Sequence, residues 1–220
     1  MFEGYVEDDY NWVPDWSKDI CAIYGSGPSL KNPPQHPKLK HVKSIAINRA
    51  HEVLPPVDVV YGCDHRFWEE HYFAGHQAKG NPLLVTQYHK SDPRRRLLDK
   101  GLRYLPLCMG AEFKLDFPVL GAGSNSGFQA LNFAYHTGCQ KILLFGFDMR
   151  HTAELHFHGP HKNLHNPATS SFPTWRQAFE GARPWLIKAG VQVYNCTPKT
   201  GLDTFKKTTV GEALEGFDGV

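Results

Sequence analysis

The sequence predicts an α/β fold of the Rossmann-like kind, a mostly parallel sheet flanked by helices on both faces. Short runs rich in β-branched and apolar residues recur along the chain and read as strands. Several of them, such as KILLFGF at 141–147, are apolar almost throughout, which is typical of strands buried on both faces. Helical patterns alternate with these strands, as in a doubly wound sheet. We expect strands at 20–24, 42–47, 57–61, 83–86, 141–145 and 191–194.

The clearest helical pattern covers residues 126–137. Ser126 is positioned to cap this helix, and Gln129 three residues later would complete a capping box. Gly138 stands where a left-handed residue ends a helix. We therefore expect a helix that begins at Ser126 and stops before Gly138.

A second helix is predicted near the C-terminus, with Pro173 near its start and Gly190 after its end. An interior proline costs a helix about 3 kcal/mol, so Pro184 predicts either a kink or two shorter helices. The apolar face of this segment comprises Trp175, Phe179, Ala182 and Leu186.

Composition limits the functions to be considered. With 41% hydrophobic and 21% charged residues, the 220-residue chain fits one nucleotide-binding domain over 1–220, with an N-terminal extension at 1–18 and a C-terminal segment at 201–220. A net charge of +2 gives no general attraction for nucleic acid, which is not an expected partner. The acidic start and the lack of a long apolar run predict a cytoplasmic protein without a membrane span. Whether subunits form a homo-oligomer is left open.

The five cysteines are odd in number and widely spaced, without a CxxC pair, so we expect reduced thiols rather than disulfides or a cysteine zinc site.

A glycine-rich loop follows the first predicted strand. Its glycines would let a phosphate approach the backbone, while a tight strand-to-helix turn without a ligand is the alternative. The loop has Leu30 where the dinucleotide fingerprint GxGxxG has its third glycine, and it lacks the GK[ST] of a P-loop. Neither of those two sites is predicted. The candidate nucleotide-binding residues of this loop are Gly25, Ser26, Gly27, Pro28 and Ser29.

Polar residues also follow other predicted strands, and the carboxyl ends of parallel strands share one edge of a sheet. Asn48 follows the second strand, Asp64 the third and Asp148 the strand at 141–145. Ser126 and Gly127 open the predicted helix, whose free N–H groups attract anions. We expect these five residues to bind the nucleotide, although Asp64 and Asp148 are also suited to capping a helix or a turn.

Four segments together resemble glycosyltransferase family 42, the CMP-sialic-acid-dependent sialyltransferases of bacteria. They are GSGPSL, the asparagine after the second strand, SGFQALNFAYHTGCQKILLFGFDM and HFHGPHKN, spread over about residues 21–199. The glycine loop and the central motif are equally similar to the archaeal-type 6-hydroxymethyl-7,8-dihydropterin pyrophosphokinase superfamily, including its phage-borne members.

The resemblance to the sialyltransferases implies a nucleotide-sugar donor, such as a CMP sugar, and a small-molecule or glycan acceptor. It implies that the glycine loop and Asn48 hold the phosphate and ribose, and that Ser126 with Gly127 contacts the nucleotide. It also implies that His161 is the general base, a role that suits an imidazole. Arg150 stands where that family has tyrosines that stabilise the departing phosphate, and a guanidinium suits the same task. No cofactor is required in this interpretation.

Three alternatives remain open at this point. A Mg²⁺-dependent pyrophosphokinase would place the ion on Asp64 and Asp148, at what we expect to be neighbouring strand ends. A nucleotide-binding module without catalysis is the second. The third is a metal site, because His156, His158 and His161 have HxHxxH spacing, although Pro160 replaces the aspartate of that motif.

Overall fold

The computed structural model describes residues 9–88, 100–160 and 166–218. Within these residues nine strands form one sheet in which every pairing is parallel. This arrangement confirms the predicted α/β class. The strands are β1 Ile20–Tyr24, β2 Lys43–Ile47, β3 Val59–Tyr61, β4 Leu83–Tyr88, β5 Leu102–Cys108, β6 Leu120–Gly121, β7 Lys141–Phe145, β8 Gln192–Asn195 and β9 Lys206–Lys207.

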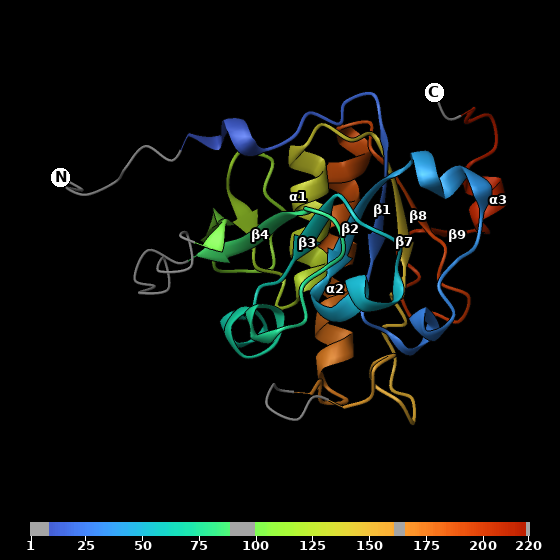
Figure 1. The fold of residues 1–220 in the computed structure, drawn as a ribbon. Coiled ribbons are helices and arrows are strands. Elements are labelled where there is room, and N and C mark those ends of the chain that lie inside the picture. The colour runs from blue at the N-terminus through green and yellow to red at the C-terminus, as the bar shows by residue number, and fades with distance from the viewer. Residues whose placement is uncertain (1–8, 89–99, 161–165, 219–220) are drawn as a thin grey trace.

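The order of the strands is β6-β5-β4-β3-β2-β1-β7-β8-β9. The chain therefore builds one half of the sheet outward from β1, returns to the other side of β1 at β7, and continues outward from there (Figure 1). In such a sheet the connections leaving the two central strands run in opposite directions, and a crevice opens at their carboxyl ends. The pair β1 and β7 marks this point.

Six strands match the predicted segments, and β1 and β7 match them residue for residue. The sequence did not predict β5, β6 or β9. Strand β5 contains Arg103 and Pro106, which weaken the strand pattern, and β6 and β9 have only two residues each. Such short strands exist because a neighbouring strand offers a ladder to pair with, which is information that local sequence does not carry.

Two long helices, α1 Ser126–His136 and α2 Ser171–Lys188, lie side by side on one face of the sheet (Figure 1). The other face is covered by short elements and by α3 Val210–Ala213. The remaining helical turns are η1 Tyr10–Trp12, η2 Pro28–Lys31, η3 Pro37–His41, η4 Asn48–Val53, η5 Phe67–His71 and η6 Tyr72–Ala74. Among the described residues, no helix is long and apolar enough to cross a membrane.

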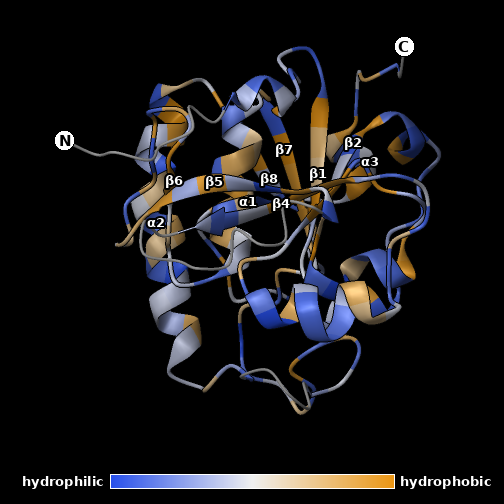
Figure 2. Ribbon diagram, turned by 60° about the vertical axis from the view of Figure 1, so that its left-hand side comes forward, coloured by the Kyte–Doolittle hydropathy of each residue, from blue (hydrophilic) through white to orange (hydrophobic). Residues whose placement is uncertain are grey.

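The strands supply two hydrophobic clusters because successive side chains point to opposite faces. In β1, Ile23 packs in the cluster under α1 and α2, whereas Ala22 belongs to the cluster under the short elements. The same alternation divides Ile45 from Ala46 in β2. In Figure 2 the central strands β1 and β7 are largely hydrophobic and the connecting segments around them largely hydrophilic. Both faces are thus buried, as the continuous apolar runs predict.

The start of α1 differs from the predicted capping box. Asn125, not Ser126, caps the helix, since its Oδ1 accepts the Phe128 N–H at 2.8 Å. Gln129 instead accepts the Tyr61 hydroxyl at 2.9 Å, a contact with the sheet that the local pattern did not indicate. The predicted end of the helix is confirmed, because Gly138 has a φ of +81°.

Of the two alternatives predicted at Pro184, a kink or two shorter helices, the second is wrong, because α2 is one helix. Pro184 lies inside it on the exposed side, where water can bond the carbonyl that loses its N–H partner.

Candidate functional site

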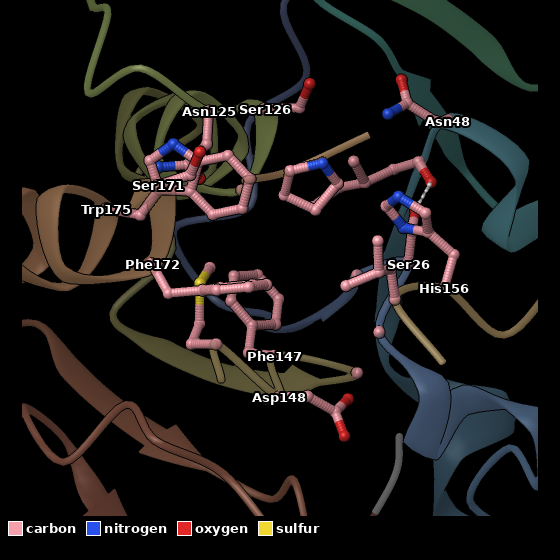
Figure 3. A pocket seen from close by; sticks show the side chains of 18 of the residues that line it. Ser26, Asn48, Asn125, Ser126, Phe147, Asp148, His156, Ser171, Phe172 and Trp175 are labelled. Carbon is pink, nitrogen blue, oxygen red and sulfur yellow. Dashed lines mark hydrogen bonds between the residues drawn. The ribbon is translucent and has the colours of Figure 1, made fainter. Parts of the chain in front are cut away.

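A cavity of about 330 Å³ opens at the carboxyl edge of the sheet, at the point where β1 and β7 part (Figure 3). Loops after β1, β2, β3 and β7 line it, together with the first turns of α1 and α2 and the segments at 155–156 and 166–167. The structure therefore brings most of the predicted residues to one place. Those that line the cavity are Gly25, Ser26, Gly27, Pro28, Asn48, Asp64, Ser126, Gly127, Asp148 and Arg150.

The glycines of the first loop serve the packing of two loops. The Gly25 N–H donates to the Phe145 carbonyl at 2.7 Å, and the Gly27 N–H donates to the Gly146 carbonyl at 3.0 Å. A Cβ at Gly27 would lie 2.1 Å from Asp148 Oδ2, and one at Gly25 would lie 2.6 Å from the Gly146 oxygen. These two N–H groups already have protein partners, so the tight-turn interpretation accounts for both glycines.

Asp148 joins the same two loops. Its Oδ2 accepts the Ser29 hydroxyl at 2.7 Å and the Ser29 N–H at 3.3 Å. The carboxylate is 5% exposed, burial raises its pKa, and in Figure 3 it points away from the middle of the cavity. Ser29 does not line the cavity among the residues described. This pair therefore fixes the cavity wall, and we assign it no direct ligand contact.

Asp64 caps the helical turn that follows it, because its Oδ1 accepts the Arg66 N–H at 2.9 Å. The expectation that Asp64 and Asp148 follow neighbouring strands is wrong. Strands β2 and β1 lie between β3 and β7, which puts the two strand ends about 14 Å apart at three interstrand spacings. Each carboxylate accepts hydrogen bonds from its own surroundings, Asp64 from the Arg66 N–H and Asp148 from Ser29.

Asn48 lines the cavity at the end of β2 (Figure 3). Its backbone has a φ of +50°, a conformation that asparagine tolerates better than most residues. Its Oδ1 is buried and has no hydrogen-bond partner among the described residues. This oxygen lies toward Gly62, since a Cβ built on Gly62 would come within 3.1 Å of it, so Asn48 would bond a ligand in the cavity through its side-chain NH₂ group.

The N-terminus of α1 forms the wall beside Asn48. The side chain of the cap residue Asn125 accepts only the Phe128 N–H of the first turn. The backbone N–H groups of Ser126 and Gly127 have no acceptor within the described part of the chain. These groups carry the positive end of the helix dipole into the cavity. The Ser126 hydroxyl donates to Cys63 Sγ at 2.9 Å, which places this cysteine in the wall as well. The helix start is thus a site for an anion.

Arg150 lies exposed at the rim of the cavity. Its Nε donates to the Lys199 carbonyl at 2.9 Å, which fixes the side chain and leaves the two terminal nitrogens of the guanidinium for other acceptors. A positive charge is thereby held at the mouth of the cavity.

His156 lines the cavity, although the sequence pointed to His161, which lies outside the described residues. The Phe157 N–H donates to the Ser26 carbonyl at 3.1 Å and holds this segment against the first loop. Burial lowers the pKa of His156, which favours the neutral form of its imidazole, the form that a general base needs. The HxHxxH spacing contains His156, yet nothing local distinguishes it from its neighbours.

The sequence also missed an aromatic wall made by Phe147, Phe172 and Trp175 (Figure 3). Trp175 belongs to the predicted apolar helical face that also contains Phe179 and Leu186. Those two residues are buried under the sheet, but the first turns of α2 extend past the sheet edge, so Trp175 faces the cavity instead.

Another cluster, whose residues do not line the cavity, has the residue types of a metal site. Glu52 Oε1, His71 and His76 lie within ligand distance of one another. Arg49 already binds the Glu52 carboxylate with two bonds of 2.7 and 2.8 Å, and the two imidazoles stack at 4.2 Å with an interplanar angle of 5°. The nitrogen lone pairs of two stacked rings lie in parallel planes and do not converge on one point, as the ligands of a metal ion must. We therefore interpret this cluster as two stacked imidazoles beside the Arg49–Glu52 ion pair.

Comparisons with models of protein families, with curated proteins and with solved structures found no match to this chain.

Proposed function

We propose that this protein is a nucleotide-binding transferase that uses a nucleotide-activated donor, such as a CMP sugar, bound in the cavity between β1 and β7. The observation that carries the proposal is that the first-turn N–H groups of α1, which have no acceptor within the described residues, and the side chain of Asn48 line the same cavity at the strand switch point. The cavity volume of about 330 Å³ is within the range of small-molecule sites.

In this proposal the phosphate lies at the N-terminus of α1, where N–H groups and the helix dipole favour negative charge. Asn48 bonds the ribose or the phosphate, and Arg150 at the rim supplies a positive charge to the departing nucleotide. The loops joined by Asp148 and Ser29 keep this geometry fixed before the ligand binds.

The transfer step needs one base. The acceptor oxygen attacks the donor carbon, the bond from that carbon to the phosphate oxygen breaks, and the nucleotide leaves with the bonding electrons. The neutral imidazole of His156 faces the cavity and takes the acceptor proton, while His161 is the candidate that the family resemblance supplies. Parallel His156→Gln and His161→Gln variants separate the two, since only loss of the true base abolishes turnover while donor binding persists.

A thermal-shift screen tests donor binding. CMP, CDP, UDP, GDP, ATP and CMP-sialic acid are each added with Mg²⁺ and with EDTA. A ligand at 100 times its Kd adds about 2.7 kcal/mol of stability, or roughly 5–11 °C for a chain of this size. We expect a cytidine nucleotide to raise Tm equally with Mg²⁺ and with EDTA, because the proposed anion site is built from N–H groups and a guanidinium.

Asn48→Gly is the matched variant, because glycine keeps the positive φ and removes the amide. It should lose most of the shift, whereas Asn81→Gly in an exposed loop should keep it. A response that requires Mg²⁺ and ATP would favour a phosphotransferase, and a flat result with all six nucleotides would refute nucleotide binding. Binding without turnover of any donor would indicate a module without catalysis.

A further inference from the structure

We infer that the first turns of α2 form a base-binding wall, in which Trp175 stacks on a planar heteroaromatic ring of the ligand. This inference rests on the proposed function and specifies it: the ligand carries a nucleobase, and that base lies at the α2 side of the cavity. A sugar phosphate without a base would leave this wall unused.

The first argument is the position of Trp175 relative to the core. Neither Trp175 nor Phe172 belongs to either of the two hydrophobic clusters under the sheet, although both are large and apolar. Phe172 is buried, and its ring meets that of Trp175 edge-on at 5.4 Å and 79°. This edge-on contact fixes the orientation of the indole and leaves a face of the indole for stacking on the ring of a ligand. These two side chains therefore build the cavity rather than the core.

The second argument is that the aromatic side chains gather on one side of the cavity. Phe147, Phe172 and Trp175 lie on the α2 side, with Ser171 and Asn125 beside Trp175, whereas Asn48 and His156 project from the opposite wall (Figure 3). A nucleotide likewise has a flat aromatic base at one end and a hydroxylated, charged group at the other. Base-to-aromatic stacking contributes about 1–3 kcal/mol per base and tolerates different bases.

The third argument is that the indole N–H of Trp175 has no acceptor within the described residues, so it is available to a carbonyl or a ring nitrogen of a base. Trp185 on the same helix gives the contrast. It is 45% exposed, it lies outside the cavity, and Lys188 Nζ sits 5.8 Å from its ring. The same residue type on one helix thus provides a candidate and its control.

Binding of CMP, AMP and ribose 5-phosphate to Trp175→Ala, Trp175→Phe and Trp185→Ala, measured by calorimetry, tests the inference. We expect Trp175→Ala to weaken the binding of CMP and AMP by about 5- to 150-fold and that of ribose 5-phosphate by less than about twofold. Trp175→Phe should keep most of the affinity, and Trp185→Ala should match the wild type. Tryptophan fluorescence should be quenched by CMP in the wild type and in Trp185→Ala, but much less in Trp175→Phe.

Two different failures can be told apart. If CMP or AMP binds in a way that Asn48→Gly abolishes, while Trp175→Ala weakens neither nucleotide more than ribose 5-phosphate, the base-binding wall is refuted and the donor site stands. If neither CMP, AMP nor any of the six compounds of the thermal-shift screen binds the wild-type protein, the proposed function and the wall are both overturned. The melting temperature of each variant without ligand shows whether it folds, and Trp175→Phe keeps the test valid if Trp175→Ala does not.

Discussion

Gly27→Ala should destabilise the protein strongly even when no ligand is present. The new Cβ would lie 2.1 Å from Asp148 Oδ2 and 2.5 Å from the Gly146 oxygen, whereas Cβ contacts below 3.0 Å essentially never occur in proteins. Neither neighbour can rotate away cheaply, because one is a backbone carbonyl and the other is a buried carboxylate. The first loop must therefore separate from the loop after β7.

The size of the loss follows from the contacts that this separation breaks. The bond from the Gly27 N–H to Gly146 and the two bonds from Ser29 to Asp148 each contribute about 0.5–1.5 kcal/mol. Accommodating the new methyl group between the two loops costs about a further 1–3 kcal/mol, the usual cost of overpacking a buried site. Because only part of each set is lost, we expect a decrease of about 3 kcal/mol in the free energy of unfolding, or roughly 6–12 °C in Tm.

Urea denaturation measures this change in the free energy of unfolding. An unchanged m value would show that the variant exposes the same amount of surface on unfolding as the wild type. Gly181→Ala is the matched control, because Gly181 lies exposed inside α2 with nothing within 4 Å of a new Cβ. That substitution should raise stability by about 0.5–1 kcal/mol. In an Asp148→Ala background Gly27→Ala should cost at least about 1 kcal/mol less, since the closest overlap is gone. If Gly27→Ala leaves the ligand-free protein unchanged and only weakens nucleotide binding, the loop-packing explanation is wrong.

Two further predictions concern stability. Burial lowers the pKa of His51 to about 4 from 6.5, so the unfolded chain binds the extra proton first, and stability should fall as the pH drops from about 6.5 to 4. His51→Gln should reduce this slope in urea titrations, exposed His41→Gln should not, and an unchanged slope in His51→Gln would contradict the assignment. The buried Asn132 accepts the N–H groups of Lys114 and Gly121 and donates to the Lys114 carbonyl. Asn132→Ala should lower the free energy of unfolding by about 3 kcal/mol because three backbone groups lose their partner, and a loss below about 1 kcal/mol would count against this role.

Local pattern was sufficient for the parts of the fold that local physics controls. The apolar runs at β1 and β7 are long enough to identify a buried strand without knowledge of its neighbours. Gly138 marks the end of α1 because only a residue that tolerates positive φ fits there. The polar residues after the strands were also recognisable, because parallel strands deliver their carboxyl ends to one edge.

Contacts between distant segments explain where these predictions stopped. Ser29 and Asp148 are 119 residues apart in the chain, and no spacing rule connects them. The capping box at Ser126 was wrong because Asn125 is the better-placed cap and Gln129 bonds Tyr61, 68 residues away. Asp64 and Asp148 looked like neighbours until the strand order placed two strands between them.

The sequence by itself determined the α/β class, the central strands and the edge of the sheet where polar groups gather, since these follow from hydrophobic periodicity and from residues with special backbone conformations. Only the tertiary structure decided that the glycines of the first loop pack against the Gly146 turn, that His156 faces the cavity and that Trp175 leaves the core. The physical reason is that strand order and the position of α2 relative to the sheet edge are set by packing over the whole chain. A helix face predicts which side chains lie together, but not whether that part of the face meets the sheet or an open cavity.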